Sequence, residues 1–132
     1  MSNIETVQAI YGAFGRGDVP AILATMTDDV VWENDLDHSP APWIIPGTGK
    51  AHVGRFFEVV GRSLEFHHFS VDSLLANENQ VAAVVRVKVT SRETGKTASD
   101  LEIHLWAFDH AGKVRAFRHF ADTLKHHQVA TG

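Results

Sequence analysis

The stretch VGRFFEVVGRSLEFHHFSVDSLL, residues 53–75, changes its hydrophobic pattern partway along, and this change decides the fold class. The apolar residues of its first half recur at i, i+3, i+4, i+7 and i+11: Val53, Phe56, Phe57, Val60 and Leu64. This spacing places them on one face of an amphipathic helix. The second half, residues 66–75, is rich in apolar and aromatic residues and predicts a strand.

Toward the C-terminus the strand pattern continues. Four strands are expected, at residues 66–75, 81–91, 97–108 and 114–120. Turn signals separate them at Asn77-Glu78-Asn79, Thr94-Gly95-Lys96 and Asp109-His110-Ala111-Gly112. Because these turns are short, consecutive strands are expected to pair in antiparallel fashion.

Toward the N-terminus two further helices are expected. The apolar residues of the first recur at helical spacing and stop at Gly15-Arg16-Gly17: Ile4, Val7, Ile10, Tyr11 and Phe14. Asp18 is a candidate N-cap for a short second helix, which tolerates Pro20 in its first turn. Thr27-Asp28-Asp29 then predicts a turn, and residues 30–33 predict a first strand.

A long irregular loop is expected at residues 35–49. It contains Pro40, Pro42 and Pro46 and two glycines. Loops of this length in compact domains are often functional. Trp43 lies in this loop and is a candidate for a lid contact over a pocket.

Composition narrows the class of protein. The 132 residues fit one domain, residues 1–132, with 44% hydrophobic and 21% charged residues. The net charge is −4 and no basic block is present, so nucleic-acid binding is not expected. There is no cysteine, no signal-peptide pattern and no apolar run of membrane-spanning length. A cytoplasmic protein without a membrane partner is expected.

The element order predicts an α+β fold. Three N-terminal helices precede a meander of strands, so the helices are expected to pack on one face of a mostly antiparallel sheet.

Motifs along the chain carry a resemblance to a known family. They are VQAIYGAF (7–14), GD (17–18), TDDVVWE (27–33), GRFF (54–57), FD (108–109), GKV (112–114) and RHFADT (118–123). In this order the chain resembles the SnoaL-like, ketosteroid-isomerase-like branch of the nuclear-transport-factor-2-like superfamily. The resemblance implies a strongly curved sheet, a cone-shaped pocket for a small apolar molecule, and a homodimer. It also implies varied chemistry, from isomerases and polyketide cyclases to dehydratases, epoxide hydrolases and non-catalytic binders, so fold alone does not assign a function.

Three residues are catalytic candidates on this resemblance: Asp122, His104 and Asn34. Asp122 matches the acid/base aspartate of the cyclases, and in an apolar pocket its charged form would be disfavoured. Its alternative role is a polar residue that ends a strand at the surface. His104 matches the hydrogen-bond-donating acid of the isomerases, and Asn34 matches their catalytic aspartate. Asn34 could orient a water or a carbonyl, or serve as a turn residue before the loop.

The sheet face on which His104 lies has two interpretations. By alternation alone, Leu101, Ile103 and Leu105 form the core face, and His104 faces solvent or a partner subunit. By the resemblance, His104 lines the pocket and the aliphatic face packs in a dimer. The residues expected at that interface are Val85, Val87, Val89, Leu101, Ile103 and Leu105.

Departures from the family's motifs exclude two known mechanisms. Ile10 stands where the isomerases carry a tyrosine, and an asparagine has no basic form with which to abstract a proton. The arginine of the epoxide hydrolases could correspond to Arg86, but Lys88 stands where its partner acid is needed. Steroid isomerisation and epoxide hydrolysis by those mechanisms are not expected.

Aromatic residues and His119 are candidates for ligand contact. The candidates for the pocket wall are Trp32, Trp43, Phe56, Trp106, Phe117 and His119. Aromatic residues at such spacings also serve as plain core. His119 and Asp122 are three residues apart and would point to opposite faces of a regular strand.

No metal site and no cofactor are expected. The nine histidines include the adjacent pairs His67-His68 and His126-His127, but none stands in a metal-binding motif. His126-His127 is expected in a mobile C-terminal tail. The leading hypothesis is a cofactor-independent acid/base enzyme (isomerase, cyclase, dehydratase or hydrolase) that acts on a small apolar metabolite. The alternatives are a non-catalytic small-molecule binder and a dimeric interaction module.

Overall fold

The computed structural model describes residues 1–132 as an α+β fold, four helices and one open six-stranded mixed sheet. The helices are α1 (Asn3–Arg16), α2 (Val19–Leu23), α3 (Lys50–Ser63) and α4 (Thr123–Ala130). The strands are β1 (Met26–Trp32), β2 (Gly47–Thr48), β3 (Leu64–Ala76), β4 (Gln80–Ser91), β5 (Thr97–Phe108) and β6 (Val114–Phe120). No helix is both long enough and apolar enough to cross a lipid bilayer.

Local sequence signals account for the helix ends. Ser2 and Glu5 form a capping box at the start of α1, and Gly17 ends the helix with a φ of 69°. Glycine adopts this left-handed conformation without steric cost. Asp18 caps α2 through a bond from the backbone N–H of Ala21, as its position in the sequence predicted.

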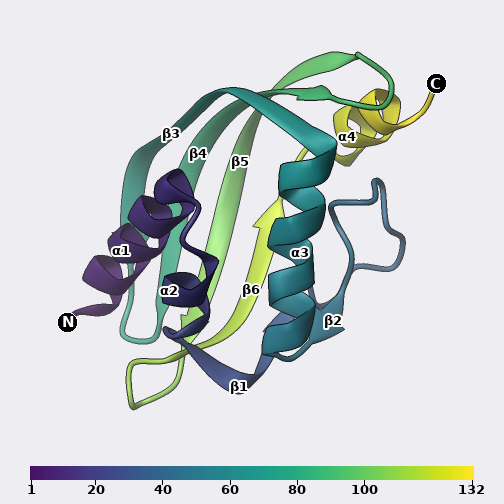
Figure 1. The fold of residues 1–132 in the computed structure, drawn as a ribbon. Helices are drawn as coiled ribbons and strands as arrows, with labels where there is room; N and C mark the ends of the chain where they lie inside the picture. Colours follow the sequence, from purple (N-terminus) through teal and green to yellow (C-terminus); the bar gives the residue numbers. More distant parts are fainter.

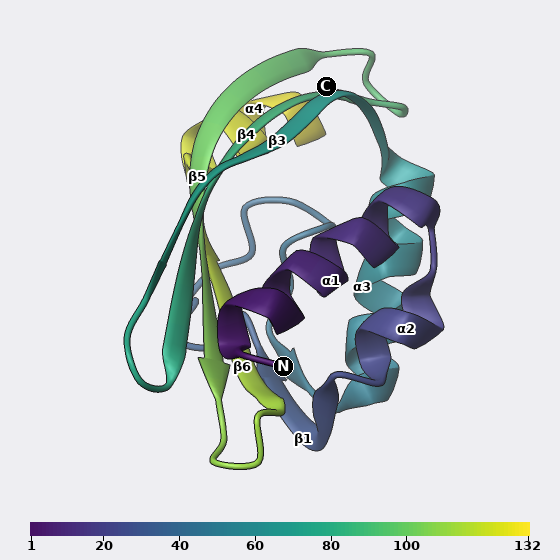
Figure 2. The ribbon, with the colours of Figure 1, turned by 90° about the vertical axis from the view of Figure 1, so that its left-hand side faces the viewer.

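The strands are arranged in the order β2-β1-β6-β5-β4-β3. Strands β3 to β6 pair with their sequence neighbours in antiparallel fashion, whereas β1 runs parallel to β6. This parallel pair brings the end of β1 beside the end of β6. The sheet bends strongly, and α1, α2 and α3 cover its concave side (Figures 1 and 2).

Two expectations about local structure were wrong. Thr27-Asp28-Asp29 lies within β1 rather than in a turn, because the register of β1 against β6 shifts between Met26 and Val31 and accommodates these residues as an irregular strand. The expected mobile tail is instead α4, which is capped by Asp122 and packs against β4 and β5. Val129 and His126 of this helix are buried.

The sheet separates a buried face from an outer face. On β4 the residues Val85, Val87 and Val89 face the core, and on β5 the outer residues are Leu101, Ile103 and Leu105. The expected interface set is therefore divided between the two faces. The outer residues are half-buried or exposed, with Leu101 50% exposed.

Candidate functional site

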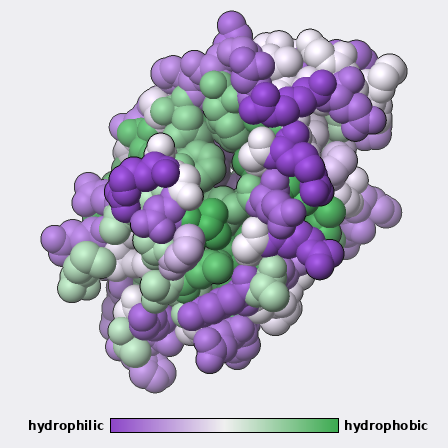
Figure 3. All heavy atoms as spheres, viewed as in Figure 1, coloured by the Kyte–Doolittle hydropathy of each residue, from purple (hydrophilic) through white to green (hydrophobic).

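A cavity lies between α1, α3 and the concave face of the sheet. Its empty volume is about 700 Å³ including the open mouth, and 15 of its 19 lining residues are hydrophobic. In Figure 3 hydrophobic side chains gather at the centre of this face, between α1 and α3, within a mostly hydrophilic rim. The lining includes all six residues expected at the pocket wall: Trp32, Trp43, Phe56, Trp106, Phe117 and His119.

Aromatic rings build the walls of the cavity. Trp32 stacks on Phe117 with ring centroids 4.2 Å apart, and Phe56 lies 5.2 Å from the Trp32 ring. Trp43 differs from an exposed lid residue, because it is only 5% exposed and its indole N–H donates to Nδ1 of His126 over 2.9 Å. The loop thus supplies a fixed part of the wall.

The four lining residues that are not hydrophobic form a polar patch in this apolar cavity: Glu102, His104, His119 and His126. Glu102 and His104 lie on the same face of β5 as Trp106, and all three are buried. The aliphatic residues of β5 point outward instead. Alternation alone predicted the reverse, because it cannot tell that the polar face meets other buried polar groups.

The hydrogen bonds of His104 define its protonation. The indole N–H of Trp106 donates to the Tyr11 hydroxyl over 3.1 Å, and this hydroxyl lies 2.7 Å from Nδ1 of His104. An ionised carboxylate can only accept, so the ring hydrogen of His104 is on Nε2, which donates to Oε1 of Glu102 over 3.2 Å. Nδ1 of the neutral ring is then an acceptor, and the Tyr11 hydroxyl donates to it.

The tautomer of His126 is fixed in the same way, on the opposite side of the Glu102 carboxylate. Its Nδ1 accepts from Trp43, so its hydrogen is on Nε2, 2.8 Å from Oε2 of Glu102. The same nitrogen lies 3.2 Å from Oδ2 of Asp100. Each oxygen of the Glu102 carboxylate thus accepts from one histidine.

Burial and these contacts shift the pKa values. Burial raises the pKa of the Glu102 carboxyl, but the hydrogen bonds from His104 and His126 outweigh it and lower the pKa below its usual value. Burial lowers the pKa of His104 more than the Glu102 carboxylate raises it. Glu102 is therefore ionised and His104 neutral near neutral pH. Burial raises the pKa of Tyr11 as well, which keeps its hydroxyl protonated.

His119 and Glu33 form a second buried pair. Nδ1 of His119 lies 2.7 Å from Oε2 of Glu33, and the backbone N–H of His119 donates to Oε1 over 2.8 Å. Glu33 is fully buried and has a φ of 56°, a left-handed conformation that non-glycine residues rarely adopt. Burial lowers the pKa of His119, but contact with Glu33 outweighs it and raises the pKa above its usual value. No hydrogen bond within the protein involves its Nε2, and the close contact between Nδ1 and Oε2 of Glu33 lacks the alignment of a hydrogen bond.

Two of the three expected catalytic residues lie outside the cavity. Asp122 is exposed and caps α4, accepting from the backbone N–H of Lys125 over 3.2 Å. Asn34 is exposed too, and its amide donates to Asp35. The position expected for Asp122 at the inner end of the pocket is therefore corrected, since β6 ends at Phe120 and Asp122 lies at the exposed start of α4. Of the three, only His104 lines the cavity.

Sequence reasoning missed four residues of the site: Tyr11, Glu33, Glu102 and His126. Glu102 carried a signal, since it lies two residues before His104 on the same strand face. Tyr11 belongs to the apolar stripe expected on the first helix, which signalled burial but not a polar role. Glu33 follows the inward-facing Trp32 and would point outward on a regular strand, so only its left-handed backbone turns it inward.

Stability is expected to reach a maximum near pH 6.5, the ordinary pKa of an unfolded histidine. Since the pKa of His119 is raised, its contribution is complete below that pH and is lost as the pH rises through the folded value. The pKa of His104 is lowered, so its contribution is present above that pH and is lost as the pH falls. The dependence of stability on pH is measured as the free energy of unfolding by denaturant at a series of pH values on both sides of this maximum. Glu33→Gln should remove the fall on the alkaline side, and an unchanged fall would contradict the role of the pair.

Known proteins with the same fold are similar to this chain. A family model for the SnoaL-like domain matches residues 7–124. A nuclear-transport-factor-2-like protein of Burkholderia thailandensis is 26% identical over 100% of this chain and 99% of its own, with a TM-score of 0.87. One of unknown function from Burkholderia pseudomallei is 27% identical over 100% of both chains, with a TM-score of 0.86. TerC, co-crystallised with polyporic acid, is 25% identical over 97% of both chains, with a TM-score of 0.82. None of the curated proteins matches the chain.

Proposed function

This chain belongs to the SnoaL-like domain family, and from that premise we propose that its cavity binds a small apolar molecule and exchanges a proton with it through His119. The observation that carries the proposal is the His119–Glu33 pair at the wall of an otherwise apolar cavity. A buried carboxylate at Nδ1 orients the ring and stabilises its charged form, so that Nε2 can give or take a proton.

The other polar groups of the cavity do not offer an equivalent atom. Both ring nitrogens of His104 and of His126 are engaged in hydrogen bonds within the protein. Nε2 of His119 is free of such a partner, so a ligand oxygen placed against it would meet the one available proton donor among these rings. We expect this exchange to need neither a metal nor a cofactor.

The residues of the cavity wall suit a flat apolar ligand that carries a carbonyl or hydroxyl group. Aromatic rings such as Trp32, Phe56 and Phe117 offer faces and edges for stacking. TerC, which shares the fold, was co-crystallised with polyporic acid, and this supports a small-molecule ligand in the present cavity.

Deuterium exchange tests the proposed function without knowledge of the substrate. A panel of apolar ketones and hydroxyquinones is incubated with the protein in D₂O, and deuterium next to the carbonyl is followed by NMR. Accelerated exchange on a compound that also binds is the expected result. Binding without exchange across the panel would favour the alternative, a non-catalytic binding protein, which the predominance of hydrophobic residues in the lining also fits.

We propose that the chain forms a homodimer through the outer sheet face. Val84, Ile103 and Phe120 lie opposite one another across β4, β5 and β6, and Leu101 adds exposed apolar surface. The protein is expected to elute at twice its chain mass of 14.5 kDa in size-exclusion chromatography with light scattering. Ile103→Asp should give the monomer, because it places a charge in an apolar contact.

A matched control is Leu124→Asp. Leu124 is 62% exposed but lies on α4 rather than on the sheet. This variant should stay dimeric. A monomeric wild-type protein would contradict the interface.

A further inference from the structure

We infer that Glu102 is a positioning residue: its carboxylate holds His104 and His126 as neutral rings that donate from Nε2, so that His119 alone among these histidines exchanges protons with a ligand. The inference rests on the proposed function only for the role of His119. The hydrogen-bond arrangement around Glu102 stands independently of any ligand.

Two chains of hydrogen bonds run toward the Glu102 carboxylate, and Asp100 offers His126 a second acceptor. One arm runs from Trp106 through Tyr11 to His104, and the other from Trp43 to His126. Both arms begin at an indole, which can only donate, and both end at a carboxylate, which can only accept. No group between them can reverse without leaving two donors or two acceptors in contact. Such a network fixes both tautomers.

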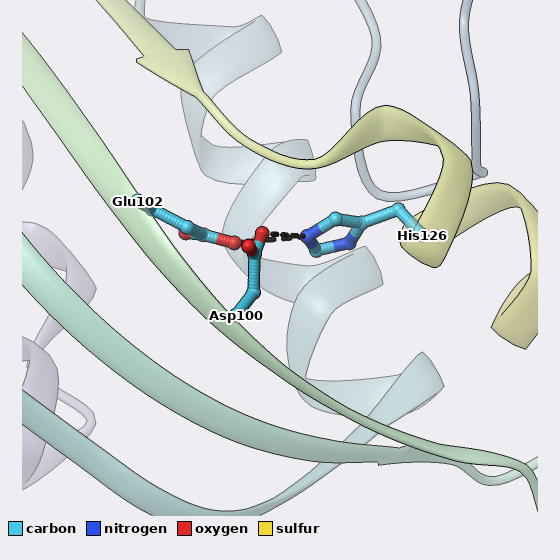
Figure 4. Close-up of side chains that lie close together, drawn as sticks. All are labelled: Asp100, Glu102 and His126. Atoms are coloured by element: carbon cyan, nitrogen blue, oxygen red, sulfur yellow. Dashed lines mark hydrogen bonds and ion pairs between the residues drawn. The ribbon is translucent and has the colours of Figure 1, made fainter.

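Because these hydrogen bonds place the ring hydrogen of His126 on Nε2, we infer that the cluster of Asp100, Glu102 and His126 holds a proton and not a metal ion. Its candidate ligand atoms lie within 4.8 Å of one another, and His126 reaches from α4 toward the two carboxylates of β5 (Figure 4). A metal would need the lone pair of Nε2, with the ring hydrogen on Nδ1 and an acceptor beside it. Trp43 places a donor beside Nδ1 instead.

His119 is surrounded by charged and titratable groups, and Glu102 of this network is one of them. Glu33 follows β1, Arg118 precedes His119 on β6, Glu102 and His104 lie on β5, and His126 lies on α4. The negative charge of Glu102 adds to that of Glu33 in favouring the protonated ring of His119, whereas Arg118 opposes it. Neutralising Glu102 should therefore affect His119 through space as well as its two direct partners.

Glu102→Gln makes a sharp test, because a glutamine amide offers one acceptor and one donor to two histidines that both donate. One arm must break or its histidine must change tautomer. The measurement is the ¹⁵N NMR spectrum of the histidine rings, which distinguishes the Nδ1–H tautomer, the Nε2–H tautomer and the doubly protonated ring. The wild-type protein should show the Nε2–H tautomer for His104 and His126 near neutral pH.

In Glu102→Gln, the ring ¹⁵N signals of at least one of these two histidines should move, through a changed tautomer or a broken hydrogen bond, and the titration midpoint of His119 should move to lower pH. Glu65→Gln is the matched control, because Glu65 is exposed on β3, and it should change none of the three rings. Should Glu102→Gln fail to fold, Trp43→Phe removes the donor to His126 alone. That variant should keep His126 as the Nε2–H tautomer, because Nε2 still faces the Glu102 carboxylate, and a shift to the Nδ1–H tautomer would contradict the role of Glu102.

The inference is overturned if the ring ¹⁵N signals of His104 and His126 and the His119 midpoint are the same in wild type and Glu102→Gln. It is also overturned if Zn²⁺ displaces the Nε2 hydrogen of His126 in the wild-type protein. These readouts need no substrate, so they separate the inference from the proposed function. If the tautomers are as expected but no compound shows deuterium exchange, the result would count against the proposed function alone.

Discussion

Replacing His119 with glutamine is expected to slow deuterium exchange on a bound carbonyl compound by about 10²–10⁴-fold, the usual contribution of a positioned acid or base. Glutamine keeps much of the size of the ring and can still hydrogen-bond to Glu33, but it cannot take up or release a proton at this pH. Ligand affinity should change far less than the rate, because most of the cavity wall is apolar and remains in place. The rate and the dissociation constant are measured on the same compound.

Asp122→Asn provides the matched control for this experiment. Asp122 is exposed and caps α4, and asparagine is an equally good N-cap. The exchange rate and the stability should therefore stay close to wild type. A large loss of rate in Asp122→Asn, with His119→Gln unaffected, would restore the role that the family motif implies for Asp122 and remove the one proposed for His119.

Replacing Trp32 with alanine is expected to lower the free energy of unfolding by about 3–5 kcal/mol. Trp32 is 1% exposed and its ring contacts Phe56, Trp106 and Phe117. The loss is measured by denaturant unfolding monitored by far-ultraviolet circular dichroism, since the substitution also changes the fluorescence.

Two further variants test whether the loss of stability comes from the buried aromatic ring of Trp32. Trp32→Phe should cost less, because it keeps an aromatic ring and removes the indole N–H, which has no hydrogen-bond partner. Leu124→Ala, at an exposed position of α4, should stay within about 0.5 kcal/mol of wild type. Equal losses at positions 32 and 124 would show that the Trp32 cluster is not the centre of the core.

The predicted elements agree with the structure where hydrophobic periodicity is strong. The apolar stripe on α3 and the strands β4, β5 and β6 are at the predicted positions, within a residue or so at each end. Prediction failed at Thr27-Asp28-Asp29 and at the C-terminus. In both places the local residues favour a turn or a mobile segment, and tertiary contacts impose a strand and a helix instead.

The candidate site could be predicted only in part. The aromatic wall and His104 were accessible from residue type and motif, because both depend on position within one element. The pairing of His119 with Glu33 depends on β1 lying parallel to β6, and on a left-handed residue that no sequence pattern signals. The contact between Trp43 and His126 joins residues 83 positions apart. Its formation requires the loop before β2 and α4 to pack against each other.

By itself the amino-acid sequence determined the α+β class, the order of the elements apart from β2 and α4, and the apolar character of the cavity wall. These features follow from period, turn residues and side-chain volume, which act locally along the chain. Only the tertiary structure decided which of the nine histidines face the cavity and which carry a fixed hydrogen. The physical reason is that a buried proton is placed by all of its neighbours at once. Those neighbours, from α1, β1, β5, β6, α4 and the loop before β2, come together only when the helices and the loop have packed against the sheet.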